Sequence, residues 1–131
     1  MGARLLPEHP LANSWAVMIE AAGPLLRKGH DAWALYPIGQ SRPAASAVPS
    51  IPGFTVYAVP AGPDWLYVGQ TRQPLRQRLE QHLRDPYKFS TWPDVVALAL
   101  DEKVTGYDVD RLERLGHEIL RPRSGRRWAR A

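Results

Sequence analysis

The chain has 131 residues, of which 44% are hydrophobic and 23% charged, so it is long enough for one hydrophobic core and too short for several domains. It contains no cysteine, which excludes a disulfide framework, a zinc finger and a thiol nucleophile. The formal net charge of +4 weakly favours polyanionic partners. The longest hydrophobic run, 95–100, is far shorter than the roughly 20 residues that span a bilayer. With no secretory signal visible, we expect a soluble, cytoplasmic protein.

Residues 1–52 differ in composition from the rest of the chain. Seven prolines interrupt them, and a Pro/Ala/Ser-rich stretch over 40–50 is typical of a linker. Ser14 can cap a short helix over 15–22, in which apolar residues recur at helical spacing. We therefore expect a partly helical N-terminal appendage over 1–52, including the linker, and a separate unit over 53–131 that ends in a basic tail.

The remainder of the chain predicts the order strand, strand, helix, strand, helix. The first two strands are rich in β-branched and aromatic residues and flank a Pro/Gly loop, which is typical of a β-hairpin. The first helix carries leucines at i, i+4 and i+8, and the third strand is an unbroken apolar run. Asp108 is expected to cap the last helix. The elements are expected over residues 54–59, 65–68, 74–84, 95–100 and 109–120. This order predicts an α+β fold with a small three-stranded antiparallel sheet and flanking helices.

Five polar or aromatic residues stand out against this pattern. On the first helix, Arg78 and His82 are spaced i, i+4 and border the apolar face. On the last helix Glu113 lies on the apolar side, where a carboxylate needs a cation, an arginine or a metal as partner. Tyr57 and Tyr67 should face away from their aliphatic neighbours on the hairpin. Taken singly, Arg78 and Glu113 are as compatible with a structural ion pair as with a functional one. His82 alone is more often a hydrogen-bonded border residue than a catalyst, and the two tyrosines alone are more often ordinary strand residues.

Taken in order, the same residues resemble the GIY-YIG nuclease superfamily. The two triplets that give the family its name appear as Thr-Val-Tyr at 55–57 and Tyr-Val-Gly at 67–69. The following helix supplies an arginine and, four residues later, a histidine. The last helix supplies Glu113, followed nine residues later by Pro122. The resemblance covers roughly 53–122 and implies a three-stranded sheet with flanking helices.

Three positions depart from the family pattern. Thr55 replaces the glycine of the first triplet, and a strand residue suits that place. Gln77 stands where many members carry a second basic residue. Gly125 stands where an asparagine often follows the proline.

The resemblance implies an endonuclease that hydrolyses nucleic-acid phosphodiester bonds with a divalent metal, and DNA is favoured over RNA as substrate. Glu113 would bind one Mg²⁺ or Mn²⁺, with water and phosphate as the other ligands. Arg78 would stabilise charge on the phosphate oxygens. Tyr57 would act as general base or orient the attacking water. Tyr67 would position Tyr57 or contact the phosphate. His82 would relay a proton or bind substrate.

Arginines outside this group are expected to bind backbone phosphates without reading bases. These are Arg72, Arg76, Arg84, Arg121, Arg123, Arg126 and Arg127. Two alternatives stay open. The same fold can serve as a nucleic-acid-binding module without catalysis, or as an adaptor that binds a protein through its N-terminal apolar segment.

Overall fold

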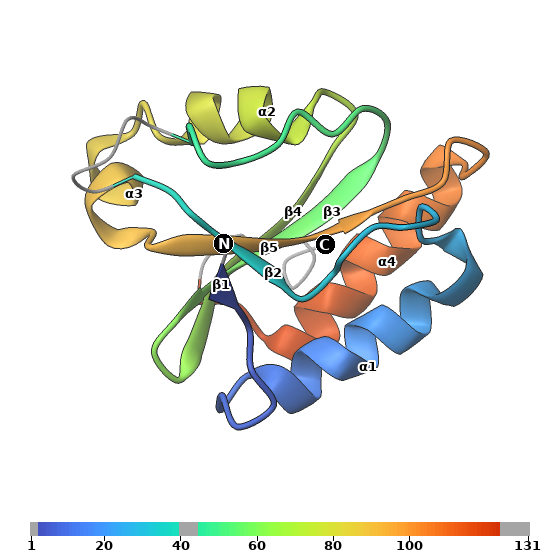
Figure 1. The fold of residues 1–131 in the computed structure, drawn as a ribbon, viewed down its shortest axis with the longest axis horizontal. Coiled ribbons are helices and arrows are strands. Elements are labelled where there is room, and N and C mark those ends of the chain that lie inside the picture. Colours follow the sequence, from blue (N-terminus) through green and yellow to red (C-terminus); the bar gives the residue numbers. More distant parts are fainter. Residues whose placement is uncertain (1–2, 40–44, 124–131) are drawn as a thin grey trace.

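An antiparallel sheet of five strands lies between two pairs of helices (Figure 1). The computed structural model describes residues 3–39 and 45–123. The strands are β1 (Ala3–Arg4), β2 (Ala34–Pro37), β3 (Thr55–Ala61), β4 (Asp64–Thr71) and β5 (Asp94–Ala99). Their order across the sheet is β1-β2-β5-β3-β4, which leaves β4 at one edge.

The helices divide between the two faces of the sheet (Figure 1). One face is covered by α1 and α4, and the other by α2 and α3. Their bounds are α1 (Ala12–Ala22), α2 (Leu75–His82), α3 (Pro86–Thr91) and α4 (Gly106–Leu120), with a short 3-10 helix at Gly23–Leu25. Among residues 3–39 and 45–123, no helix combines the length and the apolar character that a membrane span requires.

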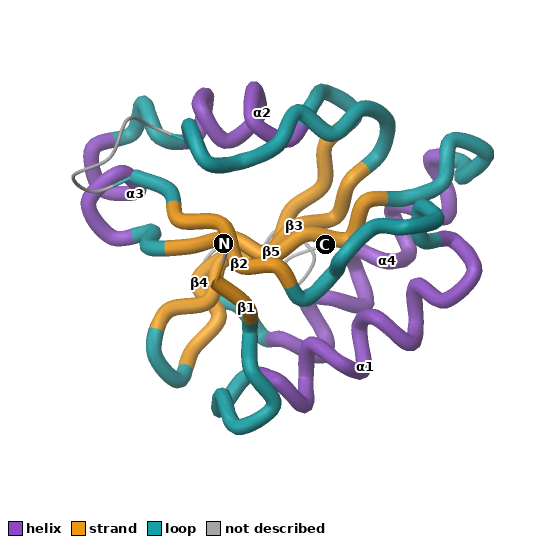
Figure 2. Tube along the Cα trace, in the orientation of Figure 1, coloured by secondary structure: helices purple, strands orange, loops and turns teal. Residues whose placement is uncertain are grey.

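The α+β class and the antiparallel pairing agree with expectation, whereas the expected sheet of three strands was too small. The two further strands come from residues 1–52: β1 pairs with β2, and β2 pairs with β5. Figure 2 shows both strands continuing the sheet beyond β5. The segment expected as an appendage is partly helical, and it completes the sheet and covers one face. Part of the expected linker, 40–44, lies outside the described residues.

The hairpin of β3 and β4 sorts its side chains between the two faces as the alternation predicts. Val56 and Ala58 belong to the core beneath α1 and α4, whereas Tyr57 and Val59 belong to the core beneath α2 and α3. The register pairs Tyr57 with Gly69 and shifts only at the end of the hairpin, between Val59 and Pro60. Successive strand residues point to opposite faces, so Tyr57 lies on the α2 side of the sheet.

Two helices begin earlier than expected, and neither Ser14 nor Asp108 is the N-cap residue. Helix α1 starts at Ala12, and the Ser14 hydroxyl donates to the carbonyl of Leu11 instead of capping the helix. Helix α4 starts at Gly106, where Thr105 accepts from the Asp108 backbone N–H and Asp108 accepts from that of Thr105. Asp108 is therefore the third helical residue of a capping box, and the expectation that it caps the helix itself was wrong.

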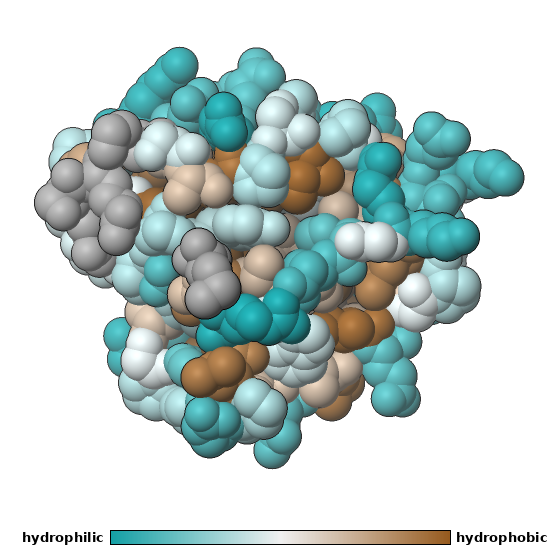
Figure 3. Space-filling model, in the orientation of Figure 1, coloured by the Kyte–Doolittle hydropathy of each residue, from teal (hydrophilic) through white to brown (hydrophobic). Residues whose placement is uncertain are grey.

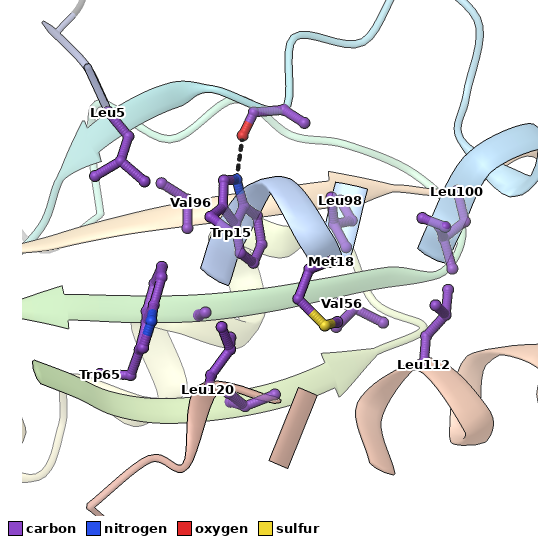
Figure 4. Close-up of a cluster of buried hydrophobic side chains, with 14 of the residues drawn as sticks. Leu5, Trp15, Met18, Val56, Trp65, Val96, Leu98, Leu100, Leu112 and Leu120 are labelled. Atoms are coloured by element: carbon purple, nitrogen blue, oxygen red, sulfur yellow. Dashed lines mark hydrogen bonds between the residues drawn. The ribbon is translucent and has the colours of Figure 1, made fainter. Parts of the chain in front are cut away.

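The N-terminal helix supplies large side chains to the core on the α1 and α4 side (Figure 4). Trp15 is 0% exposed, its indole Nε1 donates to the carbonyl of Ala32 at 2.8 Å, and its ring centroid lies 5.5 Å from that of Trp65 on β4. On α4, a Cβ placed on Gly116 would lie 3.0 Å from Val68 Cγ1 and 3.4 Å from Met18 Cε. The missing side chain thus lets α4 pack directly on β4 and against α1.

If residues 1–52 share the core with the rest of the chain, Trp15→Ala should lower the free energy of unfolding by about 3–5 kcal/mol. The measurement is urea denaturation of the full chain, in which we expect one cooperative transition. Val17→Ala is the matched control on the same helix, because Val17 is 51% exposed and should change stability by less than about 0.5 kcal/mol. Equal, small effects of the two substitutions would contradict a shared core.

Candidate active site

The two tyrosines of the sequence triplets stack over the glycine of the second triplet. Their ring centroids are 6.1 Å apart and the rings are tilted by 26°. A Cβ on Gly69 would lie 2.8 Å from Tyr57 Oη and 2.7 Å from Tyr67 Cε1, distances that a carbon atom cannot occupy without displacing the rings. Tyr57 therefore lies across the backbone of the edge strand β4, and its phenol oxygen reaches the edge of the sheet.

His82, at the C-terminal end of α2, contacts the phenol of Tyr57. Its Nε2 lies 2.8 Å from Tyr57 Oη, and its Nδ1 lies 2.9 Å from Lys88 Nζ on α3. The ring also packs against Tyr67 and Trp92, with centroids 5.0 and 5.1 Å away. Burial, and then the positive charges of Lys88 and Arg78, lower the pKa of His82 to about 4. His82 is therefore neutral near pH 7.

Arg78 lies one helical turn before His82 and is half-buried. Its Nη1 donates to Gln81 Oε1 at 3.1 Å, and its guanidinium also interacts with the Tyr57 phenol. Burial raises the pKa of Tyr57 above its ordinary range, the neighbouring Tyr67 and Glu113 raise it further, and Arg78 opposes the shift. Tyr57 consequently keeps its proton in the resting protein.

Glu113 reaches the same region from the other layer of helices. It lies on α4 and is 2% exposed, and its Oε2 lies 3.5 Å from His117 Nε2 one turn later. Although α4 covers the face opposite to Tyr57, the carboxylate still acts electrostatically on the Tyr57 phenol. This is understandable because α4 packs on β4, the edge strand that Tyr57 crosses. The inward orientation of Glu113 is as expected from the helical spacing.

The sequence-predicted site residues thus come from four elements, β3, β4, α2 and α4. Four of them form a connected group through Tyr57, which contacts the rings of Tyr67 and His82 and interacts with Arg78. Glu113 joins them through its electrostatic effect on the Tyr57 phenol.

As a metal site, Glu113 offers one carboxylate. No group of three or more His, Asp or Glu side chains that would hold a metal occurs within 3–39 and 45–123. A buried carboxylate within electrostatic range of a phenol fits a hard cation that takes its remaining ligands from water and phosphate, which is the usual manner of Mg²⁺. The donor set is therefore compatible with Mg²⁺ or Mn²⁺ bound together with a phosphate, and not with a preformed cage of protein ligands.

Three of the arginines expected to bind phosphate belong to α2 or its flanks. Arg72 precedes the helix, and its guanidinium lies 4.9 Å from the centre of the Phe54 ring. Arg76 Nε donates to the carbonyl of Val48 at 2.6 Å. These two and Arg84 are exposed. Polar side chains gather over α2, at the top of Figure 3.

The other four arginines lie elsewhere. Arg121 follows α4 and adopts a left-handed backbone with φ of 49°. Arg123 forms an ion pair with Asp64, 3.0 Å away at the turn of the hairpin. Because the start of α4 lies next to Arg72 and its end leads to Arg121, a helix of 15 residues, about 22 Å long, separates the two groups. Arg126 and Arg127 lie outside the described residues.

Lys88 is a residue of this region that sequence reasoning missed. It lies on α3, a short helix that was not expected between 84 and 95. The signal was present, because Asp85 accepts from the backbone N–H of Tyr87 and Pro86 follows as the first helical residue. Asp-Pro in this arrangement is a common helix start.

Comparison of the chain with protein-family models, with curated proteins and with solved structures finds no match. The likeness to the GIY-YIG superfamily accordingly rests on the residues quoted from the sequence.

We expect Gly69→Ala to lower the free energy of unfolding by about 1–3 kcal/mol, because the added methyl group overpacks two tyrosine rings, one of them fully buried. Thermal or urea denaturation measures the loss, and near-ultraviolet circular dichroism reports the displaced rings. Gly106→Ala is the control, since its Cβ would meet only the far end of the Arg72 side chain, at 3.2 Å. A neutral Gly69→Ala variant would refute the steric argument.

The pKa of His82 predicts a specific acid sensitivity. Because the folded protein holds this pKa at about 4, below the ordinary 6.5, the unfolded chain binds the proton first as the pH falls. The stabilisation that depends on neutral His82 is complete above pH 6.5 and is lost between pH 6.5 and 4, by at most about 3 kcal/mol. Urea denaturation of the wild type and of His82→Gln across this range gives the free energy of unfolding of each protein. The difference between the two removes the contribution of the other histidines, which both proteins share. Parallel pH curves for the two proteins would contradict the low pKa.

Proposed function

We propose that the protein is a divalent-metal-dependent endonuclease of the GIY-YIG type, which hydrolyses nucleic-acid phosphodiester bonds, with DNA as the preferred substrate. The observation that carries this proposal is the group around Gly69. Two tyrosines, an arginine and a histidine contact one another there, within electrostatic range of a buried glutamate. These residue types match the three tasks of the reaction, which are orientation of water, neutralisation of phosphate charge and binding of a cation.

Each side chain has a task that follows from its environment. Arg78 is half-buried beside Tyr57, so it would donate to the non-bridging oxygens of a phosphate that approaches the phenol. Tyr57 would orient the attacking water through its oxygen. Glu113 would hold the cation, which when bound supplies positive charge to the phosphate and to the leaving oxygen. Tyr67 is half-buried and stacks on Tyr57, which keeps that ring in place.

A nucleic-acid-binding module without catalysis is the second candidate. The observation that favours it is burial, because Tyr57 is 0% and Glu113 is 2% exposed. A substrate can then reach them only after a rearrangement, whereas the exposed Arg72, Arg76 and Arg84 are accessible to phosphate as they stand.

For the nuclease proposal, purified protein with Mg²⁺ should cut at least one substrate in a panel of single-stranded, duplex and branched DNA and RNA. Cutting should stop when EDTA removes the metal. Arg78→Ala and Glu113→Gln should each lower the cleavage rate roughly 100-fold or more, because charge developing on the phosphate loses its partner. Glu80→Ala and Glu118→Gln are the matched controls, since both residues are exposed on the same helices.

The panel also separates the two candidates. Cleavage that survives both Arg78→Ala and Glu113→Gln would remove these residues from the mechanism. A gel shift on one of the substrates without any cleavage in Mg²⁺ or Mn²⁺ would favour the binding module.

A further inference from the structure

Lys88, His82 and Tyr57 form a hydrogen-bonded chain with a defined direction. The Lys88 Nζ lies 2.9 Å from His82 Nδ1, and His82 Nε2 lies 2.8 Å from Tyr57 Oη. The three residues come from three different elements, α3, α2 and β3. This hydrogen-bonded group is largely buried, because the His82 residue is 7% exposed and Tyr57 is 0% exposed.

The Lys88 ammonium determines which atoms of His82 and Tyr57 donate and which accept. A lysine ammonium has three N–H donors and no acceptor, so Nδ1 of His82 must accept. A neutral imidazole that accepts at Nδ1 carries its hydrogen on Nε2, and this hydrogen points at Tyr57 Oη. The phenol oxygen is therefore an acceptor toward His82, and the histidine has no lone pair on that side with which to take the phenol proton.

The position of Lys88 is itself determined by its surroundings. Its ammonium lies 5.4 Å from the centre of the Tyr67 ring and 5.2 Å from that of Trp92, distances at which a cation is attracted by an aromatic face. Within 3–39 and 45–123, the charged or titratable groups that face His82 from the elements around it are Lys88, Arg78, Tyr57 and Tyr67. None of these is a carboxylate, so no residue of this group offers Nδ1 a better partner than the ammonium does.

We propose that Lys88 is a positioning residue that holds His82 in the Nε2–H tautomer. His82 then donates a hydrogen bond to the Tyr57 phenol during the reaction and does not accept the phenol proton as a base. This role rests on the proposed nuclease function. The resemblance implies that His82 relays a proton or binds substrate, and the Nε2–H tautomer excludes transfer of the Tyr57 proton to His82 Nε2. A phenol that receives N–H donation is stabilised when it loses its proton. Together with Arg78, the chain would thus offset the burial that raises the pKa of Tyr57.

Nitrogen NMR of the histidine rings in the full-length protein tests the tautomer directly, with His82 assigned by its absence in His82→Gln. Near pH 7 we expect Nδ1 of His82 to be unprotonated and Nε2 to be protonated. In Lys88→Met, which keeps an apolar stem but no donor, we expect a mixture of tautomers and a pKa of His82 that rises from about 4 toward 6.5. Lys88→Arg should preserve the wild-type pattern, and Lys103→Met, at an exposed site, should not alter it.

Cleavage supplies a second measurement with its own outcome. Lys88→Met should lower the rate roughly tenfold or more and move the acid limb of the pH profile to higher pH, and Lys88→Arg should restore most of the rate. A proton on Nδ1 in the wild type, or an unchanged tautomer and pKa in Lys88→Met, would overturn the role of Lys88 even if the protein cleaves. If Lys88→Met does not fold, the wild-type spectrum alone decides. Absence of cleavage with the expected NMR pattern would overturn the nuclease proposal instead, leaving Lys88 as the residue that sets the tautomer.

Discussion

The packing of Tyr57 across Gly69 is the constraint on which the candidate site depends. Because no side chain stands on Gly69, the Tyr57 ring crosses the edge strand β4 and its oxygen reaches the border between the two layers of helices. At that border it contacts His82 from one layer and comes within electrostatic range of Glu113 from the other. A methyl group at this one position would interfere with both tyrosines at once.

Burial governs the charge state of the residues gathered there. Removing an ionisable group from water favours its neutral form, so the phenol of Tyr57 keeps its proton and the imidazole of His82 does not gain one. Arg78 opposes the rise of the Tyr57 pKa, and Lys88 and Arg78 both lower the pKa of His82 further. A neutral pair of hydrogen-bonded rings is the resting state, and positive charge in the neighbourhood is what favours the phenolate.

The N-terminal segment contributes to the site indirectly. Trp15 and Met18 of α1 pack in the core beneath α4, and Met18 lies against Gly116 of that helix. Gly116 lies one helical turn from Glu113. The contact between α1 and α4 therefore helps to fix the position of the Glu113 carboxylate relative to Tyr57. The N-terminal segment thus supports the position of Glu113 through the shared core.

The sequence by itself determined the local elements and the orientation of single side chains. Alternation placed Tyr57 opposite Val56, and helical spacing turned Glu113 inward, because both depend on backbone periods of a few residues. Tertiary structure alone decided the strands β1 and β2, whose two and four residues are too short to leave a pattern and are defined by partners elsewhere in the chain. It also decided the contact of Lys88 with His82, since the five intervening residues must first turn into α3. The distances between elements depend on how their side chains pack against one another. The hydrophobic periodicity of a single segment carries no information on that packing.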